Sequence, residues 1–353
     1  MPFAFQQVTI ATEAFLLLFF FHQALPSSFM FRTPVNPTAL LHPIRLSDRL
    51  LCVGSCFAQA MGRRFEENKF TTVINPFGIL YNPVSLCRLL LSTVQDEKPP
   101  AATYLERDGL HFNYLFHSDF HASTQADLQG QIVRAMAGTH EFLHTADWVI
   151  ITLGTAFYYE HIATRQIVAN CHKMPSRTFR KRRLEPSEIV ATFEQMLSAM
   201  PSFNPHVRYL LTVSPVRHVR DTLEQNAVSK AALRLAVDQL QRQYPDQVHY
   251  FPSYEIMLDD LRDYRFYSAD MLHPSEVAED YIWEKLVNSC LDQEAVAFLQ
   301  QWKPLRQALQ HRPFHPASAA HQQFLQQTLG KLKQLSDKVD VHSEIEQLEQ
   351  QLL

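Results

Sequence analysis

Glycine is scarce in this chain, with 8 among 353 residues. The sequence has neither G-x-G-x-x-G nor G-x-x-x-x-G-K followed by Ser or Thr, so it lacks the backbone cradles of dinucleotide-binding and P-loop proteins. An excess of one charge is also absent, because the formal net charge is only −4. That balance favours neither a nucleic-acid-binding nor a membrane-surface protein. We therefore expect no nucleic-acid partner and no cofactor.

Cysteines are few, odd in number and irregularly spaced: Cys52, Cys56, Cys87, Cys171 and Cys290. This pattern favours reduced thiols over a disulfide framework, and hence a cytoplasmic location. A zinc site can be drawn from Cys52, Cys56, Cys171 and His172. Structural zinc sites usually have closer paired spacing, and no C-x-x-C pair occurs, so we expect no metal.

Residues 1–29 stand apart from the rest of the chain. Their apolar run over residues 14–21 is too short to span a bilayer, and we expect no stable membrane span. Three interpretations are open: an extension upstream of a true start at Met30, a weak export signal, or an added helix. Lys and Arg are missing before Arg32, which is unusual for an export signal. Export is the alternative to a cytoplasmic location.

Residues 30–300 alternate between strand and helix patterns about five times. Apolar or β-branched runs predict strands over 50–53, 69–74, 148–153, 208–213 and 248–251. The run over 148–153 is continuously apolar, as in a strand buried on both faces. This alternation predicts an α/β fold, with helices on both sides of a parallel sheet of about five strands.

Residues 301–353 have a different composition and form a separate C-terminal region. Gln is frequent, and Leu325, Leu329 and Leu332 have helical spacing. We expect a helical extension that packs on the core or on a partner chain, with self-association through these helices as the interaction to look for.

The most informative stretch runs from Leu50 to Ala58. An apolar strand ends at Gly54, Ser55 follows, and helical spacing then begins. This order puts a hydroxyl at the carboxyl edge of a parallel sheet, where ligands bind in open α/β sheets. Ser55 is therefore a candidate nucleophile. Cys56 is a rival, because a helix start favours a thiolate, although a small buried cysteine is the commoner case.

A D-x-x-H pattern, Asp270 and His273, lies after the last strand and just before a helix. A serine nucleophile needs a base, and the base needs an orienting group. At this spacing the carboxylate can reach the imidazole Nδ1–H while Nε2 faces outward. Alone, the pattern is more often a surface Asp and a capping His. The order Ser, Asp, His on an α/β sheet is one known solution to the triad geometry.

Several motifs in chain order resemble the GSCFA-domain proteins. They are G-S-C-F-A at 54–58, N-P-F-G-I-L-Y-N-P at 75–83, N-C-H-K at 170–173, V-S-P-V-R-H at 213–218 and D-Y-R-F-Y at 263–267. The resemblance covers roughly residues 31–290 and implies membership of the SGNH/GDSL hydrolase superfamily. It therefore implies a flavodoxin-like three-layer sandwich. It also implies Ser55 as nucleophile, His273 as base, Asp270 as its orienting group, and the N–H groups of Ser55 and Gly78 as oxyanion donors.

The chain departs from that superfamily in its third block, normally G-x-N. Here the block is Gly154-Thr155-Ala156, so the asparagine donor is missing. Losing one oxyanion donor typically costs ~10²–10³ in rate. The residues expected around the oxyanion or the substrate, in addition to Gly78, are Gly154, Thr155, Asn75, His218, Asn170 and His172.

These features predict an esterase-type serine hydrolase acting on a small-molecule or carbohydrate acyl ester, the carbohydrate by analogy alone. One alternative is an O-acyltransferase with the same triad. The other is a non-catalytic glycan-binding or scaffold domain, as Ala156 suggests. The basic run from Arg177 to Arg183 either steers an anionic substrate or forms a solvated loop.

Overall fold

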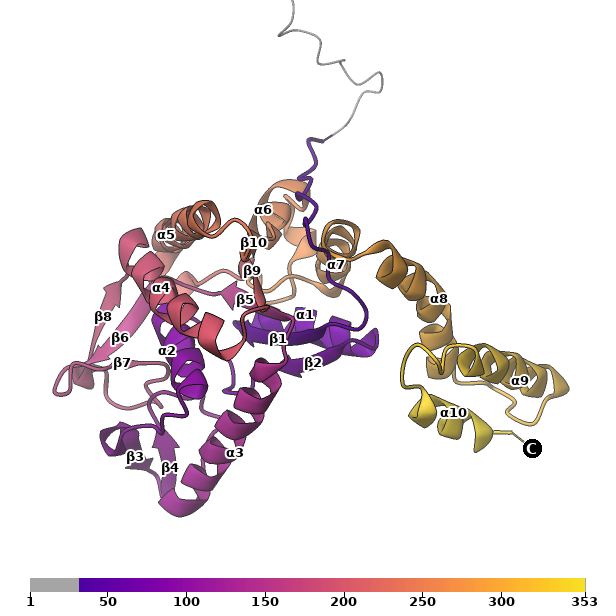
Figure 1. Ribbon diagram of the computed structural model, residues 1–353, viewed down its shortest axis with the longest axis horizontal. Coiled ribbons are helices and arrows are strands. Elements are labelled where there is room, and N and C mark those ends of the chain that lie inside the picture. The colour runs from indigo at the N-terminus through magenta and orange to yellow at the C-terminus, as the bar shows by residue number, and fades with distance from the viewer. Residues whose placement is uncertain (1–31, 353) are drawn as a thin grey trace, which may run out of the picture. The chain divides into compact units, whose positions relative to one another are not determined.

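Five parallel strands form the central sheet of the computed structural model, which describes residues 32–352 (Figure 1). Every described helix and strand belongs to one compact unit, which begins at Val35. The apolar run at 14–21 and Met30 lie outside the described residues. The strands are β1 (Arg49–Gly54), β2 (Thr71–Ile74), β5 (Trp148–Leu153), β9 (Arg208–Val213) and β10 (Val248–Tyr250). The prediction of about five parallel strands is confirmed.

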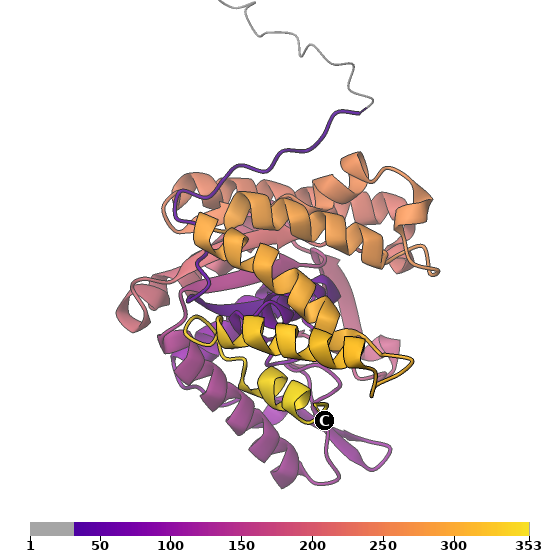
Figure 2. The same ribbon diagram turned by 90° about the vertical axis from the view of Figure 1, so that its right-hand side faces the viewer.

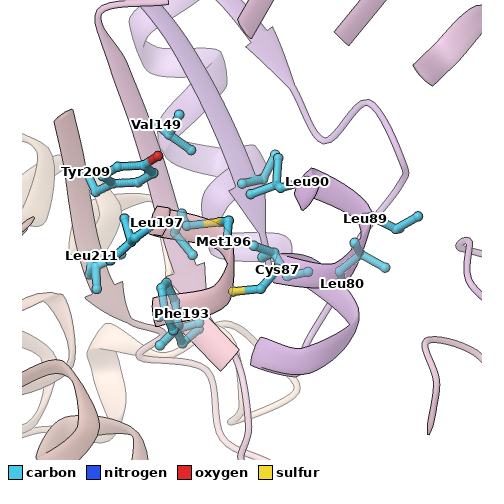
Figure 3. Packing of buried hydrophobic residues seen from close by; sticks show 14 of the residues in the cluster. Leu80, Cys87, Leu89, Leu90, Val149, Phe193, Met196, Leu197, Tyr209 and Leu211 are labelled. Carbon is cyan, nitrogen blue, oxygen red and sulfur yellow. The ribbon is translucent and has the colours of Figure 1, made fainter. Parts of the chain in front are cut away.

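Helices cover both faces of this sheet, which explains the uninterrupted apolar runs of its inner strands. Successive strand residues face opposite sides, so Leu51 packs among the helices of one layer and Leu50 among those of the other. One layer contains α2 (Pro83–Val94), α3 (Gln125–His144), α4 (Pro186–Phe203) and α5 (Thr222–Gln243). The other contains α1 (Cys56–Glu67) and α7 (Glu276–Cys290). Figure 3 shows part of the first core, including Cys87, Leu90, Phe193, Leu197, Val149, Tyr209 and Leu211.

Two small antiparallel sheets accompany the central one. A hairpin consists of β3 (Tyr104–Arg107) and β4 (Leu110–Asn113). The insertion after residue 154 forms β6 (Phe157–His161), β7 (Ile167–Val168) and β8 (Phe179–Arg183), in the order β7-β6-β8. Short helical segments are η1 (Ala101–Thr103), η2 (Ser176–Thr178), η3 (Val219–Asp221), α6 (Ser253–Glu255), η4 (Ile256–Asp260) and η5 (Tyr264–Phe266).

Three helices follow the sheet domain: α8 (Gln293–Gln310), α9 (Ala319–Lys333) and α10 (His342–Glu349) (Figure 2). They confirm the predicted helical C-terminal region. The indole of Trp302 on α8 donates to Glu67 O at 2.8 Å, and Lys69 pairs with Glu344 of α10. The region is thus attached to the C-terminal end of α1. No helix within residues 32–352 has the length and apolar character needed to cross a membrane.

The strand order β10-β9-β5-β1-β2 places the first strand inside the sheet. The chain leaves β1 toward β2 on one side, and the later strands all add on the other side. Open α/β sheets bind ligands outside the carboxyl ends of the strands at such a reversal. Here the reversal lies between β1 and β5, so the segments that begin at Ser55 and Gly154 leave the sheet at the same edge, from paired strands.

Gly54 makes the turn from β1 into α1 sterically feasible. Its φ is 130°, and a Cβ built on it would lie 2.2 Å from the carbonyl oxygen of Thr152. The next residue donates its N–H to that same oxygen at 3.0 Å. The backbone of β1 therefore approaches β5 more closely than any side chain at position 54 would allow.

We predict that Gly54→Ala lowers the free energy of unfolding by about 3 kcal/mol or more, because backbone strain and overlap with Thr152 add. Denaturant unfolding followed by circular dichroism measures the change. Gly138→Ala is the matched control: position 138 is an exposed helical site with no atom within 4 Å of a new Cβ. It is expected to gain up to ~1 kcal/mol from helix propensity. Equal stability of the two variants would contradict the role given to Gly54.

Candidate active site

Ser55 occupies the N-cap position of α1, but its side chain does not cap the helix. The residue is 1% exposed, and its Oγ has no hydrogen-bond partner among residues 32–352. Leaving a buried polar group unpaired costs about 1–3 kcal/mol, so the hydroxyl is available to a group that a ligand would bring. The positive end of the α1 dipole favours negative charge beside it.

Asn75 is coupled to the nucleophile candidate through Gly54. Its Oδ1 accepts from Gly54 N–H at 2.9 Å, and its backbone N–H donates to Cys52 O at 2.8 Å. The backbone φ of 43° is one that asparagine tolerates better than most residues. Its Nδ2 is buried and has no partner in the described part of the chain. Asn75 therefore has an uncommitted N–H donor at the edge where Ser55 lies.

The two backbone donors that the superfamily resemblance assigns to the oxyanion are engaged with the protein in this structure. Gly78 N–H donates to Asn75 O at 2.8 Å, and Ser55 N–H donates to Thr152 O at 3.0 Å. Gly78 has φ of 75°, and a Cβ there would lie 2.2 Å from the Cβ of His117. His117 is thus a neighbour of this turn, from a segment in which no periodicity pointed to a site.

The segment that lacks the asparagine is held from two sides. The N–H groups of Gly154 and Thr155 donate to Tyr81 O at 2.9 and 3.0 Å. The hydroxyl of Ser229 on α5 lies 3.0 Å from Thr155 Oγ1 and accepts from Ala156 N–H at 2.8 Å. Ala156 is fully buried in the hydrophobic core. A larger polar side chain at position 156 would have to displace packed neighbours.

Asp270 and His273 form a hydrogen-bonded pair. Asp270 Oδ2 lies 2.6 Å from His273 Nδ1, while Oδ1 accepts from the N–H groups of Leu272 and His273 at 2.9 and 3.0 Å. The backbone N–H groups of His273 and Leu272, followed by the imidazole, lower the pKa of Asp270 to about 2. The carboxylate is therefore ionised at neutral pH and fixes the orientation of the ring. Both side chains are about half exposed.

The loop that carries this pair is tied to the carboxyl end of β9, because Arg217 N–H donates to Leu272 O at 3.2 Å. From there His273 acts electrostatically on His218. Ser55 Oγ makes no hydrogen bond within residues 32–352, so the Ser55–His273 bond expected of a triad is not formed in this structure. Hydrogen bonds of catalytic groups are often long without substrate and shorten in the complex.

His218 follows β9 and is mostly buried. Its backbone N–H donates to Asn226 Oδ1 at 3.0 Å, and its ring lies edge-on to Tyr81 with centroids 6.0 Å apart. Burial, followed by the charge of Lys230, lowers the pKa of His218 to about 4. The imidazole is therefore neutral near pH 7. Its Nε2 is buried and unpartnered among the described residues, and it can form a hydrogen bond with a substrate.

Lys230 on α5 is the site neighbour that the sequence-based expectations omit. It is 1% exposed, and its Nζ donates to Gly154 O at 2.7 Å and to Ser214 O at 2.6 Å. A signal was present in the sequence: the apolar face marked by Leu233 and Val237 continues one turn back to Lys230. A lysine on a core-facing stripe indicates a buried charge.

The surroundings of the cysteines do not favour the two roles considered for them, a Cys56 nucleophile and a zinc site. Burial raises the pKa of the Cys56 thiol, which opposes its use as a nucleophile at neutral pH. Burial also raises the pKa of Cys52 to about 12 and that of Cys171 to about 11. Across residues 32–352 no cluster of three His, Cys, Asp or Glu side chains is arranged to hold a metal ion.

The turn at 170–173 attaches the insertion to the β3–β4 hairpin. Asn170 Oδ1 accepts from His172 N–H at 2.8 Å, and His172 Nε2 lies 2.8 Å from Asn113 O. The His172 ring is buried beside Phe112, with centroids 5.0 Å apart, and burial lowers its pKa. The contacts described for these two candidates are with the hairpin and the turn itself.

The basic run at the end of the insertion belongs to η2 and β8. Three of its members form ion pairs: Lys181–Asp221, Arg182–Glu160 and Arg183–Glu185. Lys181 also lies over the Phe157 ring at 4.7 Å and acts on His218. Lys181 is therefore the member of the run whose charge reaches His218, while Arg182 pairs with the buried Glu160 and the Arg183–Glu185 pair is on the surface.

Several solved structures resemble this chain at low identity. One, from Streptococcus pneumonia, is provisionally described as a platelet activating factor; its TM-score is 0.36, with 12% identity over 69% of this chain and 83% of that chain. A mutant of Axe2, an acetyl-xylooligosaccharide esterase from Geobacillus stearothermophilus, has a TM-score of 0.34, with 12% identity over 70% of this chain and 96% of its own. A catalytic mutant of Axe2, described as an acetylxylan esterase, has a TM-score of 0.33, with 13% identity over 71% and 98%. A search of curated proteins found no match.

Two family models match the sequence. Residues 302–353 match the C-terminal domain of the GSCFA domain proteins, and this segment includes α9, α10 and the last turns of α8. Residues 49–286 match the GSCFA family itself, from the first residue of β1 to within α7. The second match spans well over half of the chain and includes Ser55, Asp270 and His273. The chain therefore belongs to the GSCFA family.

Proposed function

We propose that this protein is a serine hydrolase that cleaves acyl esters through an acyl-enzyme on Ser55. The observation that carries the proposal is the buried, unpartnered Ser55 Oγ at the N-terminus of α1, where the sheet order reverses. This is the position at which open α/β sheets bind ligands. The Asp270–His273 pair supports it further, because an oriented imidazole is the group that a serine nucleophile requires.

In the proposed reaction, Ser55 Oγ attacks the ester carbonyl while His273 Nε2 takes the hydroxyl proton and passes it to the leaving alcohol. Water then attacks the acyl-enzyme with His273 again as base, which releases the acid and restores Ser55. Asp270 holds the Nδ1–H side of the ring throughout, since its low pKa keeps it ionised. His273 has to close to hydrogen-bond distance of Ser55 Oγ as substrate binds.

Asn75 is the donor that we propose for the oxyanion in place of the missing asparagine. Its Oδ1 is committed to Gly54 N–H, which fixes the amide plane and leaves Nδ2 buried without a partner among the described residues. A preorganised donor of this kind stabilises charge that develops only in the transition state. The neutral imidazole of His218 and the partly exposed ring of Tyr81 beside it suit the polar and apolar faces of a sugar, so we propose a carbohydrate as the alcohol part of the ester.

We predict that Ser55→Ala lowers turnover of p-nitrophenyl acetate by roughly 10³-fold or more, since removing the nucleophile leaves only binding and oxyanion stabilisation. The fold should be retained, because Ser55 Oγ has no hydrogen bond to lose within the described chain. Release of p-nitrophenol measures the rate, and a thermal melt checks the fold. Wild-type turnover in a folded Ser55→Ala protein would refute the assignment.

Cys56→Ala is the matched control for this experiment, because it removes the neighbouring candidate nucleophile and should retain activity. A fluorophosphonate probe should label the wild type and Cys56→Ala, but not Ser55→Ala. Absence of labelling in the wild type would favour the non-catalytic alternative. Product analysis with added sugar acceptors distinguishes hydrolysis from acyl transfer, because a transferase would yield a new ester in place of free acid.

Asn75→Asp is the sharpest test of the oxyanion donor. The substitution keeps the Oδ1 acceptor for Gly54 N–H but puts a negatively charged acceptor where the Nδ2 donor was, so kcat should fall ~10²–10³-fold or more, and burial of the charge should lower the stability as well. Steady-state kinetics gives the ratio. Asn170→Asp is the control: its Oδ1 acceptor for His172 N–H is likewise kept, and kcat should stay within about twofold. Similar rate losses in both variants would contradict the choice of Asn75.

A further inference from the structure

Lys230 joins two strands beneath the carboxyl edge of the sheet. Its hydrogen bonds reach Gly154 O after β5 and Ser214 O after β9, and these strands are neighbours in the sheet. One residue earlier on α5, Ser229 binds the Thr155–Ala156 segment. Two successive residues of one helix therefore hold the loop in which the third-block asparagine is missing.

The ammonium of Lys230 has no carboxylate partner among residues 32–352. Its neighbours are the Tyr254 ring on α6, 5.8 Å from Nζ, together with Cys56 on α1 and His218 after β9. Two carboxylates that act on these neighbours are paired elsewhere: Glu255, which acts on Tyr254, pairs with Arg234, and Glu279, which acts on Cys56, pairs with Arg64. An uncompensated buried cation costs several kcal/mol, so its retention at a crevice requires a functional explanation.

The charge of Lys230 acts on Cys56, the residue next to Ser55, and on His218. Burial raises the pKa of the Cys56 thiol and the charge of Lys230 opposes that rise, whereas burial and then the charge of Lys230 lower the pKa of His218. Lys181 and His273 lower the pKa of His218 in the same sense, but more weakly. A cation that acts on the N-terminus of α1 favours any negative charge formed there, and a low-dielectric surrounding strengthens the effect.

We infer that Lys230 is a positioning residue of the proposed acyl-transfer site: its buried ammonium holds the ends of β5 and β9 together and favours the oxyanion that forms beside Ser55. This inference rests on the proposed function. In the superfamily pattern, the third-block asparagine stabilises the oxyanion through a hydrogen bond. Here we assign part of that stabilisation to the charge of Lys230. Lys230 touches neither substrate nor the reacting atoms, and it acts through Gly154 and through its field.

A buried ammonium in this role gives the reaction a specific pH dependence. Burial lowers the pKa of Lys230 to about 7, so the side chain is charged below that pH and becomes neutral above it. Oxyanion stabilisation should therefore weaken as pH rises through about 7. The wild-type kcat profile should then fall on its alkaline side, with that limb belonging to Lys230.

Three variants of the full-length protein test this assignment with p-nitrophenyl acetate between pH 5 and 10. Lys230→Gln keeps a donor without the charge, and its kcat should fall about 10–100-fold below pH 7 with KM little changed and no alkaline limb near pH 7. Lys230→Arg keeps the charge at all these pH values, so activity should persist above pH 8. Lys230→Met removes both donor and charge and should be the least active.

Lys285→Gln is the matched control. Lys285 likewise donates to a backbone carbonyl, that of Val35, but it is only partly buried and has a carboxylate beside it in Asp260. Its variant should keep the wild-type profile. A merely structural role of Lys230 would lower kcat equally in all three variants and leave the alkaline limb in place. If Ser55→Ala still inactivates the enzyme, that result would overturn the inference about Lys230 and leave the proposed function standing.

A second measurement does not depend on turnover. Between pH 7 and 10.5 the unfolded chain binds a proton at Lys230 that the folded protein does not, so this group makes the folded state more stable as pH rises. The wild type should therefore gain stability over this range relative to Lys230→Met, provided both fold.

If the variants fail to fold, an NMR titration of the lysine Cε resonances of the wild type replaces this comparison. A titration midpoint near pH 7 supports the inference, and the absence of any midpoint below pH 9 overturns it. Failure of Ser55 labelling would instead refute the proposed function.

Discussion

The close approach of β1 to β5 at Gly54 determines where each group of the candidate site lies. Without a Cβ, Gly54 can lie against the Thr152 carbonyl, and its N–H then binds the Asn75 side chain. The loop after β2 is thereby anchored on the residue that precedes the nucleophile candidate. The same loop continues to Tyr81, whose carbonyl accepts the N–H of Gly154. One glycine thus couples the loops that follow β1, β2 and β5.

Three polar atoms at this edge are buried without partners in the described chain: Ser55 Oγ, Asn75 Nδ2 and His218 Nε2. Folded proteins leave few such atoms, because each costs free energy that a hydrogen bond would recover. Ser55 Oγ and Asn75 Nδ2 lie at the reversal of the sheet and are connected through Gly54, while His218 Nε2 follows β9, the next strand but one from β1. A hydroxyl, an amide donor and a neutral imidazole are complementary to the polar groups of an ester or a sugar, and none requires a metal ion.

The features that sequence predicted are those that depend on local pattern. Strands buried on both faces give continuous apolar runs, as at 148–153, and the three-residue spacing of Asp270 and His273 sets their geometry within one turn. Whether the N–H of Gly78 is free depends instead on the fold of its turn, in which this N–H donates to Asn75 O. Lys230 was not predicted, for a different reason. The helical pattern identifies the core-facing side of α5, but it does not show which strand ends supply carbonyl groups to a buried ammonium.

Ala156, at the position where the superfamily resemblance would place an asparagine, changes how the proposed site would stabilise negative charge. A side-chain donor acts along one direction at about 3 Å, so its contribution depends on the position of the substrate carbonyl. A buried charge acts over a longer distance and in no single direction, so it tolerates variation in the substrate. Its contribution depends instead on protonation. With Ala156 in the core and α5 holding the loop through Ser229 and Lys230, the proposed site would combine one directional donor, Asn75, with a charge whose strength pH controls.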